Sequence, residues 1–373
     1  MLVDAPALRE LRDALSGLAE LPGAASSIVQ HPDWVLFELE SRSDGTELHV
    51  VIVRDEAGTI VGYAPFLAAK TTTRIAMGKH AFPLHHGRTL RLLGAQAVAA
   101  PARRDEVERV IAQVIKDEPG ARVVHLQEAE LPSMLANRLT EGRAAFTCRE
   151  ANLLAQVKWI IEPQESLASY LAKMKSKSRK NLFRRVRNVY STLGPETHLR
   201  IVETPEEVDE YCALMNQVYP RSWHADAQVI DWQLPARREL FRQLATRQQF
   251  IGHLLMLGGR PIAYVHGYRL GDRYLLDDIG YDEEFGKLGV GLALVFEAIQ
   301  DLIERNPRQL VDFGYGDNQY KRVLGTRQTS CGSLYAVRGL WARACFNMIT
   351  PLRWAYSVAR RIQRKRDDAT AED

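Results

Sequence analysis

Alternating and uniformly apolar runs indicate an antiparallel meander in the second half of the chain. The runs span residues 250–257, 262–270 and 273–281. They are separated by Gly258-Gly259 and Gly271-Asp272, and both pairs tolerate the positive φ angles of tight hairpin turns. The pattern therefore predicts three strands joined by two hairpins. A glycine-rich loop, a helix ending near Arg305 and a strand at 310–313 are expected to follow.

The first half of the chain shows a looser version of this pattern. Alternation predicts a hairpin with arms at 47–53 and 59–67, whereas residues 80–96 show no clear period and are expected to be irregular. Other expected elements are helices at 7–20, 104–116 and 131–139 and a strand at 122–127. Both halves contain a hairpin that ends in a strand with Tyr and Gly, so we expect a duplicated α/β unit. The first copy has only Leu93-Gly94-Ala95 and no Gly-x-Gly loop, so we expect it to lack a cofactor site.

Strand and helix signals also alternate between the two hairpins. We expect a strand at 153–161, a strongly basic helix at 164–190 and a helix at 235–248. Thr204 is expected to cap a further helix, with Pro205 in the first turn and Glu207 closing a capping box. The chain is thus predicted to have an α/β (α+β) fold of tandem units. Each unit would be a mixed, mostly antiparallel sheet flanked by helices.

The length of 373 residues suffices for two ordinary domains. We expect an N-terminal domain at 1–151, a second domain at 152–338 and a tail at 339–373. A hydrophobic content of 46% and a charged content of 25% are sufficient for buried cores. The net charge of +3 does not by itself indicate a nucleic-acid partner.

Cysteine usage and the chain start favour a cytoplasmic location. The four cysteines are far apart and form no CxxC pair, which argues against a disulfide framework or a zinc site. His80, His85 and His86 do not have metal-ligand spacing, so no metal is expected. The start of the sequence lacks the pattern of a secretory signal, and no apolar run approaches the ~18–20 residues of a spanning helix.

The loop Gly286-Lys287-Leu288-Gly289-Val290-Gly291 is the main candidate for binding chemistry. Glycines between a strand and a helix let backbone N–H groups approach a diphosphate, and the helix dipole favours negative charge there. The alternative is that the glycines only allow a tight connection. A dinucleotide-binding fold is disfavoured because the preceding strand ends an antiparallel meander, and a P-loop because no Gly-Lys-Ser/Thr follows.

This loop resembles the Arg/Gln-x-x-Gly-x-Gly/Ala loop of the GNAT acyltransferase superfamily, with Gly286 in place of the usual Arg or Gln. The motifs at 280–285 and 311–321 resemble the branch associated with cellulose or exopolysaccharide biosynthesis, which also begins with a basic helix such as 175–181. The resemblance covers about residues 152–338. Fem-type peptidoglycan aminoacyltransferases, built from two such units, are more distant relatives.

The resemblance implies transfer of an acyl group from acetyl-CoA or a longer acyl-CoA to an amine, without a metal. The acceptor would be a small-molecule or lipid-linked amine on an amino sugar, an amino acid or an envelope or exopolysaccharide precursor. It also implies cofactor contacts at Ile279, Tyr281, Lys287, Leu288, Gly289, Val290, Gly291 and Leu292. Two alternatives stay open: a Fem-like transferase that uses aminoacyl-tRNA, and a non-catalytic module that binds an anionic polymer or a membrane.

Candidate catalytic residues lie on and after the third strand of the meander. We favour Asp278 over Asp277 as the general base, and we expect burial to raise its pKa. The alternative is that both aspartates are solvated or paired near the strand edge. His266 is either an assisting base or an interior histidine. Tyr320 is the candidate acid that protonates the leaving thiolate.

Four further residues are candidates for substrate binding. Asp312 either contacts substrate or caps the turn at 314–316, and Lys321 contacts an anionic substrate or the cofactor phosphates. Arg179 and Lys180 belong to a run with eight Lys or Arg residues and no acid between 173 and 187. This run is either a solvated face or a surface for an anionic partner. Nucleic acid is not the expected partner, because aromatic residues other than Phe183 do not interleave with the run.

The tail from Gly339 to Arg366 combines aromatic residues with basic ones. Such a sequence is typical of an amphipathic segment on the inner face of an anionic membrane. The alternative is a helix packed on the body of the protein.

Overall fold

The computed structural model describes residues 2–42, 45–77, 80–118, 120–142, 145–151, 156–224, 231–356 and 358. These residues form two compact units. The first contains the described residues up to Val157 and those from Ser330 onward, and the second is Lys158–Thr329. These limits differ from the expected 152 and 338, because a strand at Arg327–Val337 pairs with two strands of the first unit.

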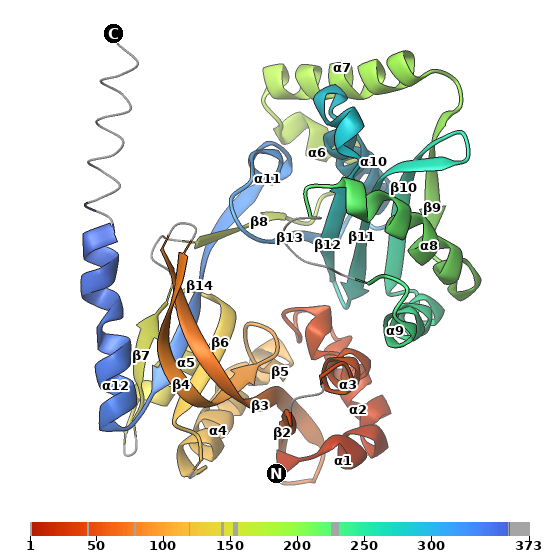
Figure 1. Ribbon diagram of the computed structural model, residues 1–373. Coiled ribbons are helices and arrows are strands. Elements are labelled where there is room, and N and C mark those ends of the chain that lie inside the picture. The colour runs from red at the N-terminus through yellow and green to blue at the C-terminus, as the bar shows by residue number, and fades with distance from the viewer. Residues whose placement is uncertain are drawn as a thin grey trace. The chain divides into compact units, whose positions relative to one another are not determined.

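The second unit is built on a sheet in the order β8-β13-β12-β11-β10-β9 (Figure 1). Its strands are β8 (Gln156–Ile161), β9 (Thr197–Val202), β10 (Phe250–Leu257), β11 (Arg260–Leu270), β12 (Arg273–Tyr281) and β13 (Leu310–Tyr315). Its helices are α6 (Leu167–Lys173), α7 (Ser176–Leu193), η3 (Pro205–Glu207), α8 (Val208–Val218), η4 (Tyr219–Arg221), α9 (Pro235–Thr246), η5 (Glu283–Leu288), α10 (Val290–Arg305) and α11 (Gln319–Leu324). The predicted meander is confirmed, since Gly258 and Gly271 take φ angles of 59° and 58° in its two turns.

The basic segment predicted as one helix at 164–190 forms two helices, α6 and α7, separated at Met174 and Lys175. α7 packs against α10, with Tyr190 Oη donating to Glu297 Oε1 at 2.8 Å. The predicted capping box is confirmed: Thr204 and Glu207 cap η3, and α8 continues from it.

The first unit has the strand order β1-β2-β3-β4-β6-β14, with β5 pairing β3 and β7 pairing β14. Its strands are β1 (Leu2–Val3), β2 (Glu47–Arg54), β3 (Ile60–Met77), β4 (His80–Leu92), β5 (Val98–Ala99), β6 (Val123–Glu130), β7 (Thr147–Glu150) and β14 (Arg327–Val337). Its helices are α1 (Ala5–Glu10), α2 (Arg12–Ala19), η1 (Ile28–Gln30), α3 (Pro32–Glu40), η2 (Pro101–Arg103), α4 (Arg104–Asp117), α5 (Met134–Thr140) and α12 (Leu340–Asn347).

The prediction that residues 80–96 are irregular was wrong for most of that segment. β4 pairs with β3 along its whole length, because Thr71, Thr72 and Thr73 extend β3 well beyond the predicted end of the hairpin. The extended hairpin of β3 and β4 carries many polar side chains. Its strands therefore show little alternation of apolar and polar residues in the sequence.

Both units repeat one plan, which confirms the predicted fold class of mixed, mostly antiparallel sheets flanked by helices. In each, an antiparallel meander is followed by a helix and by a strand parallel to the last strand of the meander. The series is β4, α4 and β6 in the first unit and β12, α10 and β13 in the second. At the loop after β4, a Cβ on Gly94 would lie 2.4 Å from the side chain of Gln30, which is fully buried. This glycine therefore accommodates a buried glutamine.

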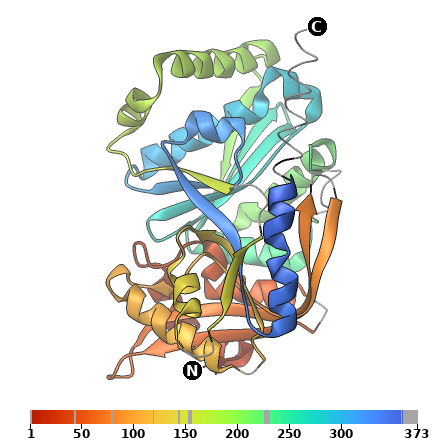
Figure 2. The ribbon, with the colours of Figure 1, turned by 90° about the vertical axis from the view of Figure 1, so that its left-hand side faces the viewer.

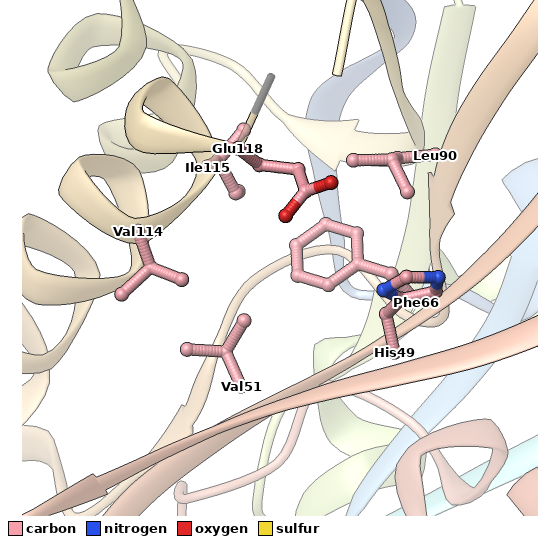
Figure 3. Close-up of a pocket in the computed structure, with 7 residues that line it drawn as sticks. All are labelled: His49, Val51, Phe66, Leu90, Val114, Ile115 and Glu118. Atoms are coloured by element: carbon pink, nitrogen blue, oxygen red, sulfur yellow. The ribbon is translucent and has the colours of Figure 1, made fainter. Parts of the chain in front are cut away.

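A small apolar pocket lies between the sheet and α4 of the first unit (Figure 3). It is lined by His49, Val51, Phe66, Leu90, Val114, Ile115 and Glu118. Its polar side chains, His49 and Glu118, take part in ion pairs with Glu47 and Arg88. Because none of the candidate catalytic residues lies here, we assign no reaction to this pocket.

Candidate active site

In the second unit, β12 and β13 separate after three pairs of residues. Arg273, Tyr274 and Leu275 pair with β13, and the described pairing ends there. β12 continues to Tyr281 and stays paired with β11 on its other side. The edge of β12 from 276 to 281 is therefore available to side chains and ligands.

A β-bulge at Asp277 sets the direction of the neighbouring side chains. Leu276 pairs with Gly267 and Asp278 pairs with His266, so two residues of β12 span one step of β11. Strict alternation would have placed Leu276 and Asp278 on the same face. Instead, Leu276 joins the core beneath α10, and Asp278 lies on the opposite face beside Tyr264.

Asp278 and His224 form a hydrogen-bonded pair at this edge. His224 Nε2 lies 3.0 Å from Asp278 Oδ1 and 3.0 Å from the carbonyl oxygen of Ile279. Both neighbours are acceptors, so Nε2 carries the proton and Nδ1 is the ring nitrogen that can accept one. Tyr264 Oη donates to Asp278 Oδ2 at 3.0 Å, and the N–H of Ile279 donates to Oδ1 at 2.9 Å. The Asp278 carboxylate is thus held on both oxygens.

The electrostatics of the pair differ from the expectation for Asp278. Burial favours a raised pKa for this carboxyl. The hydrogen bond from His224, the charge interactions with His266 and His224, and the hydrogen bond from Tyr264 together outweigh burial and hold the pKa below its ordinary value. Burial acts to lower the pKa of His224, but the contacts with Asp278 and Ile279 raise it overall. Asp278 is therefore a fixed anion, and His224 is the group of the pair that titrates nearer to neutral pH.

Tyr320 is half-buried on α11 and packs edge-on against Phe313. Burial raises the pKa of Tyr320, and the negative charge of Asp278 adds to this effect. The hydroxyl of Tyr320 is therefore neutral and can donate a hydrogen bond. The charge of Asp278 thus acts on Tyr320, and a shared role of the two residues in one site stays a prediction.

His266 lies in a closed aromatic cluster. Its side chain is fully buried among six rings, those of Tyr211, Trp232, Phe241, Phe250, Tyr264 and Tyr268. Burial lowers the pKa of His266 to about 4. These observations favour the interior histidine over the assisting base, because a substrate cannot reach the ring without displacing the cluster.

The glycine loop leads into the N-terminus of α10. Gly289 takes φ 84° and ψ 30°, and no side chain caps the helix. The first helical bond joins the N–H of Ala293 to the carbonyl of Gly289, so the N–H groups of Val290, Gly291 and Leu292 have no acceptor among the described residues. Three free donors at a helix N-terminus fit an anionic phosphate.

The ring of Tyr281 leaves little or no room for a side chain at Gly286 or Gly291. A Cβ on Gly291 would lie 2.6 Å from Cδ1 of Tyr281, and a Cβ on Gly286 would lie 3.2 Å from Cε2. The Tyr281 ring therefore packs directly on the loop. The backbone of Ile279 is already bonded to Asp278 and His224, whereas alternation along β12 directs the N–H of Tyr281 to the same open edge.

A guanidinium of α7 lies beside the loop. Arg185 is exposed, and its Nη1 would be 3.8 Å from a Cβ placed on Gly289. Lys287 is also exposed there. Arg179 donates to the carbonyl of Leu171 at 2.8 Å, which ties α7 to α6, and Lys180 is exposed. The guanidinium of Arg185 therefore lies next to Gly289, the residue that precedes the free N–H groups of α10.

Asp312 and Lys321 hold the loop after β13. Asp312 is 1% exposed, and its Oδ2 lies 3.1 Å from Lys158 Nζ and 2.9 Å from Arg273 Nη1. Its Oδ1 accepts from the N–H of Gly314 at 2.9 Å. Lys321 is 4% exposed and donates to the carbonyl of Tyr315 at 2.8 Å. This geometry favours the structural role of Asp312 over substrate binding, and it gives Lys321 a structural role as well.

His224 was not identified from the sequence. It lies in the connection between η4 and α9, where no apolar period marks a position. The only signal was a histidine directly after Trp223 and five residues after Tyr219. The structure explains this spacing, because the His224 ring stacks on Trp223 at 3.6 Å and on Tyr219 at 5.7 Å between centroids. In the described part of the chain, no group of three or more His, Cys, Asp or Glu residues could hold a metal ion.

Comparisons with known proteins agree with this geometry. Residues 176–322 match the family described as "Acetyltransferase (GNAT) domain". No curated protein matches the sequence. The fold is similar to the crystal structure of FemX, with a TM-score of 0.60 and 11% identity over 88% of this chain and 96% of that one.

Two further structures share the fold. L-PGS from Bacillus licheniformis gives a TM-score of 0.52 and 13% identity over 81% of this chain and 88% of that one. A conserved protein of unknown function from Bacteroides thetaiotaomicron gives 0.53 and 15% identity over 88% and 97%. Within the second unit, the match to the GNAT acetyltransferase domain family begins with α7, ends within α11 and includes β12, the glycine loop and Tyr320.

Proposed function

We propose that the second unit is an N-acyltransferase that moves an acetyl or longer acyl group from acyl-CoA to an amine. The observation that carries the proposal is the Asp278–His224 pair on the open edge of β12. It lies on the strand that leads directly into the free N–H groups of α10. A general base and an anion site on consecutive elements are what this reaction requires.

The residues around the glycine loop fit the diphosphate of a CoA ester. The N–H groups of Val290, Gly291 and Leu292 would hold it, and Arg185 would add a positive charge. Arg185 would thereby supply a contact that Gly286 cannot make. When bound, acyl-CoA supplies a thioester, whose carbonyl carbon forms a bond to the amine nitrogen as the carbon–sulfur bond breaks.

The side chains of the site then have separate roles. His224 Nδ1 takes the proton that the amine loses, and Asp278 stabilises the resulting imidazolium and fixes the ring. The N–H of Tyr281 points to the edge where the thioester carbonyl would lie. The neutral hydroxyl of Tyr320 donates a hydrogen bond to the leaving sulfur, because its raised pKa makes it a donor and not a base.

The acceptor in this proposal is an amine on a small molecule or on a lipid-linked envelope or exopolysaccharide precursor. The resemblance of the motifs at 280–285 and 311–321 to proteins of exopolysaccharide biosynthesis supports this class. An amine that is protonated in water must lose a proton before it attacks, which accounts for a base held beside a buried anion.

Aminoacyl transfer from charged tRNA is a second candidate function. The fold similarity to FemX over 88% of the chain favours it, since the Fem-type resemblance implies this donor. The exposed basic face of α7 would then contact the nucleic acid.

Calorimetry with CoA and turnover assays with acetyl-CoA test the two proposals together. We expect micromolar to millimolar CoA binding to the full chain, and thiol release when an amine panel is added. His224→Asn should retain CoA binding and lose about 10²–10⁴-fold in turnover. Absence of CoA binding together with transfer from aminoacyl-tRNA would refute the first proposal and support the second.

A further inference from the structure

The outer face of the C-terminal helical segment is apolar and exposed. α12 ends at Asn347, and helical structure resumes at 349–356. Its exposed positions are Leu340, Trp341, Ala344, Asn347, Met348, Thr350, Pro351, Trp354 and Ala355, and none carries a charge. Four of them are large and strongly exposed: Leu340 at 89%, Trp341 at 76%, Trp354 at 70% and Met348 at 56%. Surface helices of a monomer normally present charged residues here.

The opposite face of the segment anchors it firmly to the first unit. Phe346 and Ile349 are buried in a cluster with Ile75 of β3, Val123 of β6 and Val337 of β14. Both views show the segment lying alongside β4 (Figures 1 and 2). The inner apolar face therefore already attaches the segment to the first unit. Packing within this unit does not explain why the outer face is apolar as well.

The charged residues of the segment are bonded to the body of the unit. Arg343 Nη2 donates to the carbonyl of Ala145 at 2.9 Å, and Arg353 Nη1 lies 3.0 Å from Glu150 Oε2. Arg149 donates to Asn347 Oδ1 at 2.7 Å. Both arginines of the described segment are half-buried, so neither belongs to its exposed positions.

The sequence that follows is strongly basic. Arg360, Arg361, Arg364, Lys365 and Arg366 occur within seven residues, and the first acid after them is Asp367. A basic cluster directly after a tryptophan-containing apolar surface has the charge that complements anionic lipid headgroups. Tryptophan also favours the boundary between headgroups and acyl chains.

We propose that this face docks the protein on an anionic lipid surface, with Trp341 and Trp354 inserted at the headgroup level. No helix of the described part of the chain is long and apolar enough to cross a membrane, so contact of this kind would be peripheral. The inference does not depend on the proposed enzymatic function, because it involves the first unit and the residues after β14.

Vesicle flotation with the full chain tests the proposal. We use vesicles of phosphatidylcholine alone and of phosphatidylcholine with 30% phosphatidylglycerol, a composition of about one anionic lipid in three. Binding is expected only to the anionic vesicles and should weaken in high salt. The double variant Trp341→Ala/Trp354→Ala should bind at least about tenfold more weakly, because two interfacial aromatic anchors are lost. Replacing the five basic residues at 360–366 by Gln should abolish the salt dependence.

A matched pair of leucine variants separates the face from general surface effects. Leu340→Ala should weaken vesicle binding, whereas Leu21→Ala, at a 45% exposed leucine of the same unit, should not. All variants are compared with the parent chain by thermal unfolding. Unchanged flotation of the folded double tryptophan variant would overturn the proposal, and so would equal binding to neutral vesicles. The proposal would also be overturned if the chain forms dimers without lipid and the double tryptophan variant is monomeric, because the face would then bind a second copy of the chain.

Discussion

The position of the Asp278 carboxylate depends on one inserted residue. Without the bulge at Asp277, the side chain of residue 278 would share the core face with Leu276, and a charge would be buried under α10. With it, the carboxylate faces Tyr264 and His224, which satisfy both oxygens at 3.0 Å. In the proposed reaction, His224 is the group that exchanges protons and Asp278 is its fixed partner.

This assignment predicts the pH dependence of the proposed reaction. Turnover should rise with pH as His224 loses its proton, with a midpoint above the ordinary value of 6.5, because Asp278 raises the His224 pKa. In Asp278→Asn the midpoint should fall, since burial then acts on the imidazole without the compensating charge. Turnover rates of the parent and the variant, measured from about pH 5 to about pH 9, locate both midpoints.

Tyr264→Phe is the matched control for this pH profile. It removes one hydrogen bond from Asp278 but leaves the bond to His224 and the charge in place. The midpoint should therefore move little compared with Asp278→Asn. A midpoint that is the same in the parent and Asp278→Asn would show that His224 is not the titrating base.

Asp312 provides a second prediction at the residue scale, concerning stability. It is buried, and although burial opposes ionisation, Lys158 and Arg273 hold its pKa below 3.8. A carboxyl whose pKa is lower in the folded state stabilises the fold at pH values above its ordinary pKa. This stabilisation is lost as the pH falls towards the pKa of the folded state. Asp312→Asn should cost about 3–5 kcal/mol at pH 7, because two cations lose their partner. Urea unfolding should show a smaller loss near pH 3. An equal loss at both pH values would exclude ionisation as the cause.

At the scale of elements, α7 and α10 together form the proposed anion site. Phe183 packs edge-on against Phe296 at 5.4 Å, and Tyr190 bonds to Glu297. These contacts fix α7 so that Arg185 lies beside Gly289. A positive charge is thereby added where the helix dipole of α10 already favours anions.

Arg185→Ala should accordingly weaken CoA binding about 3- to 30-fold, the range for one charge-assisted contact at an exposed site. Arg187→Ala is the matched control, since it removes an equal charge from an exposed position of the same helix. Calorimetry at low and moderate salt measures both. Equal weakening in the two variants would indicate a general electrostatic effect and would remove Arg185 from the site.

The elements that the sequence predicted well are those with a strong local signal. The meander at 250–281 and the capping box at Thr204 were predicted because turn glycines and cap residues act locally. The bulge at Asp277 and the partnership of His224 with Asp278 were not predicted, because both depend on register between strands and on a connection that lies far away in the sequence. The pairing of β3 with β4 was missed because the side chains at 81–88 are exposed or half-buried and therefore show little apolar period.

At the scale of the whole molecule, the chain leaves its first unit and returns to it. β14 pairs with β6 on one side and with β7 on the other, although it lies almost two hundred residues further along the sequence. Its side chains Leu334, Ala336 and Val337 are buried in the first unit. The first unit is therefore discontinuous, whereas all six strands of the second unit lie between 156 and 315.

Chains cut at these limits should behave differently. Residues 156–329 contain every strand of the second unit and should unfold cooperatively when produced alone. Residues 1–157 lack β14. They therefore lose two large buried side chains, at about 1.5–3 kcal/mol each, and two rows of strand pairing. This loss is comparable with the ~5–15 kcal/mol free energy of unfolding of a typical domain. They should therefore show low-temperature or non-cooperative melting in circular dichroism. A peptide of residues 330–358 added in trans should restore part of the transition, because it supplies most of β14 and all of α12. Cooperative melting of residues 1–157 at the temperature of the full chain would show that β14 is dispensable to the first unit.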